Sequence, residues 1–397
     1  MKNFVLIGAG NRAYELFIKP LLFEEYKDSR IVGIYDVNVQ RARFLSSLSL
    51  YPIPVYDDLR QVISNDNIDV IVILTPDYMH VPLIMSCLEH NSAIIMCEKP
   101  LCTTLEQADW LYKLPCSKKE RIKVLLNSRF MPQNMRIKNI LESGIIGKPL
   151  FINYNWYIDI HHGVEYFRRW HSDNEKSGGM LVHKSCHHFD LLNWWIEDTP
   201  YSVSSMGNKL FYTTNQEVAY NCRNCINPCQ FRMEFSCSPL IKQMYFDNEH
   251  IDGYIRDKCI YRDVTINDTL CSQIAYCNGT IVSYSINFYS PFNSWNLAII
   301  GEHGSLLTDE SSTNNYIDIC IDPHFGKKVV VHVPKNLGKH YGSDWELRKY
   351  IFSNNNENAF DNWIKLGNCN DGISAAIIGI LSSKSHKENK HYVNPFI

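Results

Sequence analysis

A glycine fingerprint near the start of the chain constrains the fold more than any other feature. An apolar run, Asn3 to Ile7, leads into residues 8–13, which read G-A-G-N-R-A, and a helical pattern follows. In G-x-G-x-x-A the first glycine permits a tight turn, the second lets backbone approach a pyrophosphate, and the last small residue allows close helix packing. The helix N-terminus then offers unbonded N–H groups to the phosphates. The pattern predicts a Rossmann domain that binds a dinucleotide.

Asp36 is placed to contact the adenosine ribose. A second apolar run, Ile31 to Tyr35, ends in Asp36, about twenty residues beyond the fingerprint. A carboxylate there accepts hydrogen bonds from ribose hydroxyls and repels a 2′-phosphate. We therefore predict that the cofactor is NAD.

Strand and helix patterns alternate up to about residue 127. Apolar runs over 70–74, 93–96 and 122–126 are typical of buried strands, and helical patterns over 81–90 and 105–114 separate them. Such units require right-handed crossovers and therefore a doubly wound parallel sheet. The fold class expected for this part of the chain is α/β.

A lysine follows the strand predicted over 93–96, in the run Glu98-Lys99-Pro100. The carboxyl ends of parallel strands face the ligand crevice, so Lys99 should meet whatever the sheet binds. Pro100 has no N–H to leave unpaired and disfavours helix at Lys99. We predict that Lys99 is a catalytic residue.

Length and composition set the remaining bounds. At 397 residues the chain favours two domains, which we place at 1–127 and 128–397. A net charge of −3 without a basic run argues against a nucleic-acid or anionic-membrane partner. No apolar stretch approaches the roughly 18 residues that a spanning helix needs. Fourteen cysteines scattered through apolar elements suit reduced thiols, so we expect a cytoplasmic protein.

The order of motifs resembles the Gfo/Idh/MocA oxidoreductases, the family related to glucose-fructose oxidoreductase and inositol dehydrogenase. The matching motifs, which span nearly the whole chain, are the fingerprint, Asp36, Thr75-Pro76 with His80, Glu98-Lys99-Pro100, Asn127 to Phe130, and Gly178-Gly179 with His187 and Asp190. The resemblance implies a Rossmann domain followed by an α/β domain. In that second domain an open, mainly antiparallel sheet commonly forms the oligomer interface, so we expect a homodimer or homotetramer.

The resemblance and the fingerprint together give a set of expected cofactor contacts. They are Gly8, Ala9, Gly10, Asn11, Arg12, Asp36, Thr75, Pro76, His80, Glu98, Lys99 and Asn127.

Two histidines, His183 and His187, are four residues apart and would share one face of a helix. A zinc site of the H-E-x-x-H type is disfavoured because Lys184 stands where the glutamate would be, and we predict no metal. Core histidines satisfied by hydrogen bonds are one alternative, and proton transfer by an imidazole is another. The family pattern D-x-G-x-H-x-x-D places the catalytic histidine at His187. Here the first acid is replaced by His183 and the glycine by Ser185.

Short β runs after residue 262 predict a mainly antiparallel sheet, with a type I′ hairpin turn at Asn278-Gly279. Helical patterns over 344–352, 360–366 and 374–382 close the chain. Between about 211 and 262 lies an irregular, cysteine-containing insertion. Its cysteines are Cys222, Cys225, Cys229 and Cys237. They could bind a structural zinc ion, or they could be free thiols or form an incidental disulfide.

Aromatic and basic residues of the second domain could stack on and hydrogen-bond a sugar, although some of them would pack in the core. The predicted substrate-binding residues are Trp156, Arg169, Trp170, His183 and Lys184; Tyr254, Arg256 and His340 fall on segments that could border the cleft.

These features favour an NAD-dependent oxidoreductase. It would transfer a hydride between nicotinamide and a secondary alcohol or ketone carbon of a sugar, cyclitol or glycoside. One alternative is a glycosidase that oxidises its substrate transiently so that a substituent can eliminate. Another is a non-catalytic regulator that binds the dinucleotide.

Overall fold

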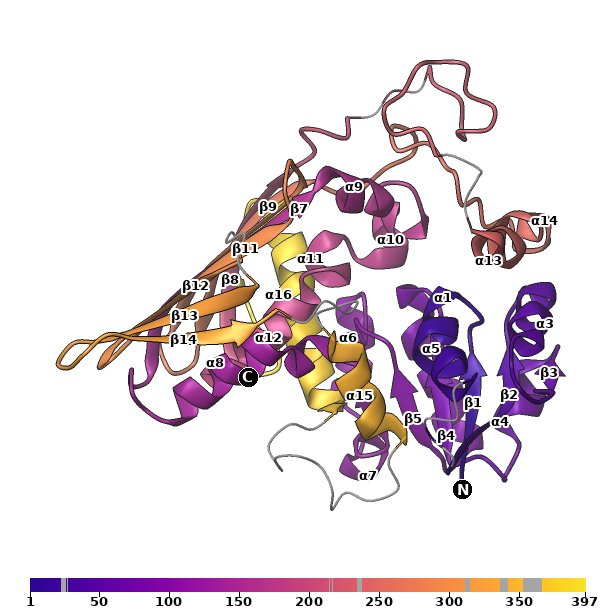
Figure 1. Cartoon of the computed structure of the whole chain (residues 1–397), viewed down its shortest axis with the longest axis horizontal. Helices are drawn as coiled ribbons and strands as arrows, with labels where there is room; N and C mark the ends of the chain where they lie inside the picture. Colours follow the sequence, from indigo (N-terminus) through magenta and orange to yellow (C-terminus); the bar gives the residue numbers. More distant parts are fainter. Residues whose placement is uncertain are drawn as a thin grey trace.

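A computed structural model describes residues 1–22, 26, 28–213, 215, 217–233, 238–310, 315–335, 342–352 and 366–397. Cys237, His340 and nearly all of the helix predicted over 360–366 lie outside these residues. The described chain forms two sheets with helices between and around them (Figure 1).

The first sheet has seven strands in the order β15-β6-β5-β4-β1-β2-β3. Its strands are β1 (Lys2–Ile7), β2 (Ser29–Tyr35), β3 (Val55–Tyr56), β4 (Val70–Ile73), β5 (Ile94–Cys97), β6 (Ile122–Val124) and β15 (Gly367–Asn368). All of these neighbours are parallel except β15, which pairs antiparallel with β6 at the edge. The predicted doubly wound parallel sheet is confirmed.

Helices cover both faces of this sheet. They are α1 (Asn11–Ala13), a π-helix (Tyr14–Ile18), α2 (Lys19–Leu22), α3 (Val39–Ser47), α4 (Leu59–Ile63), α5 (His80–His90), α6 (Leu105–Tyr112) and α7 (Cys116–Lys119). Strand β4 is buried at every position, with Ile71 and Ile73 in one apolar core and Val70 and Val72 in the other. This burial explains its unbroken run of β-branched residues.

The second sheet has nine strands in the order β14-β13-β12-β11-β7-β10-β9-β8-β16. They are β7 (Pro149–Asp159), β8 (Pro200–Asn208), β9 (Thr269–Tyr276), β10 (Ile281–Ser290), β11 (Ser294–Gly301), β12 (Gly304–Asp309), β13 (Tyr316–Pro323), β14 (Val329–Pro334) and β16 (Tyr392–Val393). Only β7 and β10 pair in parallel among these described strands. The open, mainly antiparallel sheet was predicted correctly.

The hairpin between β9 and β10 differs in turn type from the prediction. A type I′ turn needs positive φ at both Asn278 and Gly279, but only Gly279 has it, at +92°. The Gly279 N–H donates to Tyr276 O at 3.0 Å, and the Tyr276 N–H donates to Thr280 O at 2.9 Å. The glycine therefore takes the left-handed position after the turn, where no side chain is in the way.

Helices pack the second sheet against the first domain. They are α8 (Pro132–Glu142), α9 (Ile160–Gly163), α10 (Asn174–Ser177), α11 (Met180–His183), α12 (Cys186–Ile196), α15 (Ser343–Phe352) and α16 (Cys369–Glu388). Short 3-10 turns of the two domains lie at Asp77–Met79, Asn127–Phe130, Val164–Tyr166 and Trp170–Ser172. The 20-residue α16 runs through the middle of the molecule (Figure 1) and begins with a capping box.

Two elements of the C-terminal part of the chain, α15 and β15, return to the first domain. Phe352 of α15 packs against Phe4 and Phe17, with ring centroids 5.4 and 5.8 Å apart, and β15 extends the first sheet. The boundary at 127/128 stays a prediction.

The insertion crosses from the second domain to the first. Its helices, α13 (Pro239–Ile241), a π-helix (Lys242–Phe246) and α14 (Glu249–Asp252), lie beside α1 and α3 (Figure 1). The described cysteines are free thiols, and Cys222 Sγ accepts a hydrogen bond from Arg168 at 3.0 Å. Over the described ranges, no group of three or more His, Cys, Asp or Glu side chains is arranged to hold a metal ion. With Cys237 outside those ranges, zinc in the insertion stays a hypothesis.

Within the part of the chain that the structure describes, no helix combines the length and apolar character needed to cross a membrane. The cytoplasmic location stays a prediction.

Candidate active site

The fingerprint loop joins β1 to α1. Gly8 has φ +104°, and a Cβ there would lie 2.7 Å from Leu74 O, so glycine is required at this position. The Gly8 N–H donates to Tyr35 O at 2.8 Å, which ties the loop to the end of β2. These contacts give the tight turn that the glycine spacing predicts.

Asp36 is fixed by backbone donors at the end of β2. Its Oδ2 accepts from the Ala9 N–H at 2.7 Å, and its Oδ1 accepts from the Asn38 N–H at 2.8 Å. Arg41 Nη1 lies 3.3 Å from the same Oδ1. Burial raises the pKa of Asp36, while Arg41 acts in the opposite direction. The carboxylate therefore faces the fingerprint loop, where a ribose hydroxyl could reach it.

Two of the predicted cofactor residues pair with each other. Arg12 Nε donates to Glu98 Oε1 at 2.5 Å, and its Nη1 donates to Asp344 Oδ2 at 2.9 Å. Burial opposes the charge of Arg12, but Glu98 and Asp344 outweigh it and raise the pKa of the guanidinium. Asp344, on α15, was not predicted because it lies more than 300 residues from its partner.

His80 links the loops that follow β4 and β5. Its Nδ1 lies 2.7 Å from Pro100 O and its Nε2 lies 3.0 Å from Thr75 O. The imidazole is fully buried, so both ring nitrogens face backbone. This geometry makes His80 a support for Thr75 and for the cis Lys99–Pro100 peptide.

Two buried polar atoms near these loops are available to a ligand. Thr75 Oγ1 and Asn127 Oδ1 have no hydrogen-bond partner among the described residues, whereas Asn127 Nδ2 donates to Asp344 Oδ1 at 3.1 Å. Thr75 follows β4 and Asn127 follows β6, on either side of β5. Buried polar atoms normally have partners, so this pair indicates a site for a polar group such as an amide. The residues present therefore fit NAD.

Lys99 reaches across to the second domain. Its Nζ donates to His183 O at 2.9 Å. Burial opposes the ammonium charge, but Cys186, Asp77 and Glu98 nearby raise the pKa of Lys99. Lys99 is therefore a cation and a hydrogen-bond donor at neutral pH.

A break in the helix makes this bond possible. Helix α11 ends at His183, and α12 begins at Cys186 after Lys184 and Ser185. The expectation that His183 and His187 share one helix face was wrong, because they lie on successive helices. The break leaves the carbonyl of His183 at a helix end, where it accepts Lys99 Nζ and, at 3.4 Å, Cys186 Sγ. His187 follows in the first turn of α12.

The imidazole of His183 bonds to an acid from the first domain. Its Nδ1 lies 2.6 Å from Asp77 Oδ2, in the 3-10 turn after β4. Burial lowers the pKa of His183 well below its ordinary value, and Lys99 and Arg169 lower it further. Burial also raises the pKa of Asp77 well above its ordinary value, although Lys99 opposes this. Both shifts favour a hydrogen bond between neutral groups.

Aromatic rings surround His183. Ring centroids of His171, Trp170 and Tyr166 lie 4.9, 5.3 and 5.8 Å from it. Arg169, next to Trp170, has its Nε 3.6 Å from Glu165. The structure thus brings Trp170 close to His183, and sequence reasoning missed the contributions of Tyr166 and His171.

Trp156 and Lys184 form a second group on the inner face of the sheet. The Trp156 ring stacks on His188 at 4.0 Å, and the Lys184 ammonium lies 5.9 Å from its centroid. Burial, with the nearby charge of Lys99, lowers the pKa of Lys184 to about 8.

A buried ion pair joins the turn after β6 to α12 beside the site. Arg129, in the turn after β6, donates to both carboxylate oxygens of Asp190 on α12, at 2.8 and 2.6 Å. Burial raises the pKa of Asp190 to about 6 although Arg129 opposes the shift. This pair sets the position of α12, and so of His187, relative to the first sheet.

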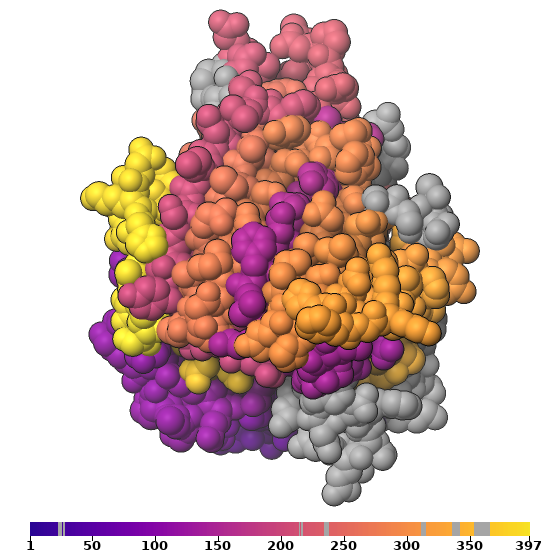
Figure 2. Space-filling view, turned by 90° about the vertical axis from the view of Figure 1, so that its left-hand side faces the viewer, coloured from indigo at the N-terminus to yellow at the C-terminus, as the bar shows by residue number. Residues whose placement is uncertain are grey.

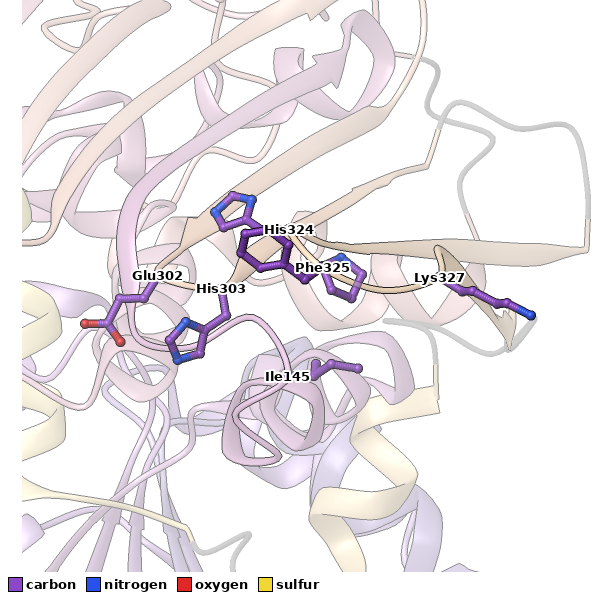
Figure 3. A pocket seen from close by; sticks show the side chains of 7 residues that line it. Ile145, Glu302, His303, His324, Phe325 and Lys327 are labelled. Carbon is purple, nitrogen blue, oxygen red and sulfur yellow. The ribbon is translucent and has the colours of Figure 1, made fainter.

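A separate cavity of about 420 Å³ lies at the rim of the second sheet (Figure 3). Its lining includes Glu302 and His303 from the β11–β12 turn, and His324 and Phe325 from the β13–β14 turn. It contains none of the predicted site residues.

Comparisons with known proteins agree with this architecture. The model of the Gfo/Idh/MocA oxidoreductase family with an NAD-binding Rossmann fold matches residues 2–126, and the model of that family's C-terminal alpha/beta domain matches residues 138–394. The oxidoreductase YteT of Bacillus subtilis is 29% identical over 385 residues, covering 89% of each chain. Inositol 2-dehydrogenase of Rubrobacter xylanophilus is 26% identical over 176 residues, which are 43% of this chain and 46% of that protein.

Solved structures share the fold. A levoglucosan dehydrogenase in complex with NADH and L-sorbose has a TM-score of 0.71 at 17% identity, covering 100% of this chain and 99% of that chain. A myo-inositol dehydrogenase from Lactobacillus casei, with NAD(H) and myo-inositol, has a TM-score of 0.65 at 16% identity over 99% and 97% of the two chains. With its two matched domains and its preserved fingerprint, the chain belongs to the Gfo/Idh/MocA family of oxidoreductases, and its first domain binds NAD.

Proposed function

We propose that the protein is a dehydrogenase that uses NAD to oxidise a secondary alcohol of a sugar or cyclitol, or to reduce the matching ketone. The observation that carries the proposal is the position of Lys99. Its ammonium lies past the end of β5, which β4 and β6 flank, and bonds to the residue that pairs with Asp77. Relatives named inositol 2-dehydrogenase and D-xylose 1-dehydrogenase support this substrate class. They give no support to the glycosidase or the regulator.

The geometry of the first domain supports a specific set of cofactor contacts. The fingerprint backbone would hold the pyrophosphate, Asp36 the adenosine ribose, and Thr75 with Asn127 the nicotinamide amide. Bound NAD supplies the acceptor or donor of the hydride.

Residues of both domains would bind the substrate oxygen and stabilise its charge. Lys99 donates a hydrogen bond to it and stabilises alkoxide charge as that charge develops. His187 takes the hydroxyl proton. If the Asp77 carboxyl donates to His183 Nδ1, the remaining proton of that imidazole is on Nε2, where it can donate to a neighbouring substrate hydroxyl. His183 would thus hold the substrate while His187 moves the proton.

A substrate screen tests the proposal. Sugars and cyclitols would be offered to the full chain with NAD, and reduced nicotinamide followed by absorbance. We expect turnover of at least one such alcohol and a loss of about a hundredfold in kcat for His187→Asn, with NAD affinity within a few-fold of the parent. Exposed His391→Asn serves as the matched control. Tight NAD binding without turnover of any such alcohol would contradict the proposal.

We also propose that the open face of the second sheet joins copies of the chain. Figure 2 shows this face at the surface, with its strands side by side. Phe151 on β7 is paired in register with Ile281 on β10 and Ile300 on β11, and all three side chains are exposed. Such an apolar row is typical of a subunit interface. Light scattering should report a dimer or tetramer, and Phe151→Glu should weaken it; a parent monomer would contradict this.

A further inference from the structure

The insertion reaches the dinucleotide site through residues 238–256, which we call the arm. The Tyr245 hydroxyl accepts a hydrogen bond from the Asn11 N–H at 2.7 Å, and a Cβ on Gly10 would lie 3.4 Å from that hydroxyl. These are the backbone groups that the fingerprint presents to a pyrophosphate. The arm therefore lies directly over the phosphate loop.

The arm also contacts the adenosine end of the site. Asn38 Nδ2 donates to Asn248 O at 2.8 Å, and Arg41 Nε donates to Met244 O at 3.1 Å. Arg41 Nη2 donates to Asp252 Oδ2 at 2.7 Å. The start of α3, just after Asp36, is thus held to the arm by several polar contacts.

Arg41 makes the charge at this end depend on the arm. Its Nη1 lies 3.3 Å from Asp36 Oδ1, so the guanidinium is within reach of the place where a ribose 2′ substituent would lie. An arginine near that place accommodates the 2′-phosphate of NADP. Arg41 cancels the charge of Asp36, and Asp252 restores one negative charge. The Arg41 and Asp252 side chains are only 8% and 11% exposed, so solvent screens this pair weakly.

We propose that the arm forms the outer wall of the dinucleotide site, and that Asp252 makes the enzyme prefer NAD by neutralising and holding Arg41. Asp252 is then a positioning residue that acts through Arg41, and Asp36 alone does not set the choice of cofactor. This inference rests on the proposed function, because it concerns the cofactor of the same reaction.

Calorimetric titration of the full chain with NAD and with NADP tests the proposal. In Asp252→Asn, NADP affinity should rise relative to NAD by about tenfold, because Arg41 loses its counter-charge. The matched control is Asp247→Asn, which removes an arm acid that pairs with Lys242 instead, and it should leave the ratio unchanged. Arg41→Met should keep NADP weak, and the double variant Arg41→Met with Asp252→Asn should lose the gain.

The possible outcomes distinguish the role of Asp252 from the proposed function of the enzyme. An unchanged ratio in Asp252→Asn with intact NAD-dependent turnover overturns the role of Asp252 and leaves the proposed function standing. Equal weakening of both cofactors overturns it too, because the ion pair would then only brace the arm. A parent that binds neither dinucleotide overturns the inference together with the proposed function.

Discussion

The dinucleotide half of the cleft and the substrate half are held in different ways. On the dinucleotide side, Gly8 and Asp36 are fixed by backbone contacts within the first sheet. On the substrate side, Lys99 and His183 depend on contacts between domains, and His183 meets an acid 106 residues away. The comparison teaches that backbone geometry prepares the fingerprint end of the cofactor site, whereas contacts between the two domains assemble the substrate side.

The largest effect should come from the residue that joins the halves. We expect Lys99→Ala to lower kcat by about a hundredfold or more, because the alkoxide loses its cationic donor, and to change NAD affinity only a few-fold. Steady-state kinetics and NAD titration measure the two quantities. The control is Lys113→Ala, an exposed lysine at the C-terminal cap of α6. A comparable loss of NAD affinity would show that Lys99 serves cofactor binding as much as chemistry, and would contradict the division of the cleft into two halves.

The link between the domains can be weakened at Asp77. We expect Asp77→Ala to lower kcat/KM by about tenfold, because the imidazole of His183 loses the group that orients it. The bond from the neutral Asp77 carboxyl favours the neutral imidazole, so without it the pKa of His183 should rise and the low-pH limb of the kcat/KM profile should move to higher pH. An unchanged pH profile and an unchanged KM would leave this pair as packing alone.

The preference for NAD over NADP should change independently of kcat. The parent should bind NAD at least about tenfold more tightly than NADP, a difference of about 1.4 kcal/mol. Asp36→Asn should reduce that ratio and leave kcat with saturating NAD within a few-fold, because Asp36 is remote from the reacting carbon. Competing titrations with the two cofactors decide this. Equal affinities in the parent would sink the assignment of Asp36.

The smallest effect concerns stability near Lys184. Its pKa is lowered from 10.5 to about 8, so between these values the unfolded chain binds more protons than the folded one. Stability from this group therefore rises with pH across that window. Lys184→Met should melt higher than the parent at pH 7, and the difference should shrink between pH 8 and 10.5. A constant difference would mean that Lys184 is not desolvated.

Much of the first domain could be predicted because its signals are local. The run over 70–74 became β4 (Val70–Ile73), and the helical pattern over 81–90 became α5 (His80–His90). Buried parallel strands are continuous apolar runs, and such runs are readable without knowing what packs on them.

The strands of the second domain were harder to predict, because the aromatic residues in them were interpreted as ligand-binding residues. The central strand β7 was missed, although Ile152, Tyr154 and Ile158 alternate with polar residues in the pattern of a half-buried strand. Trp156 continues that alternation on the inner face, where His188 stacks on it. The sequence alone therefore does not distinguish an aromatic residue that packs in a sheet from one that binds a sugar; the neighbouring side chains do.

Contacts between distant segments could not be predicted at all. The bonds from Asp344 to Arg12, from Asp77 to His183 and from Asp252 to Arg41 join residues that no spacing rule connects. The break between α11 and α12 also carries no helix-breaking residue, since Lys184 and Ser185 occupy it. These features determine the charge of the site and the positions of its side chains. They arise from the packing of distant segments against each other.

The most direct test of the two-half site is a crystal structure of the NAD complex. The account predicts the adenosine ribose on Asp36 and the nicotinamide amide between Thr75 and Asn127, with the hydride-carrying face toward Lys99 and His183. A nicotinamide amide bound away from Thr75 and Asn127, or a ring turned away from Lys99, would contradict it.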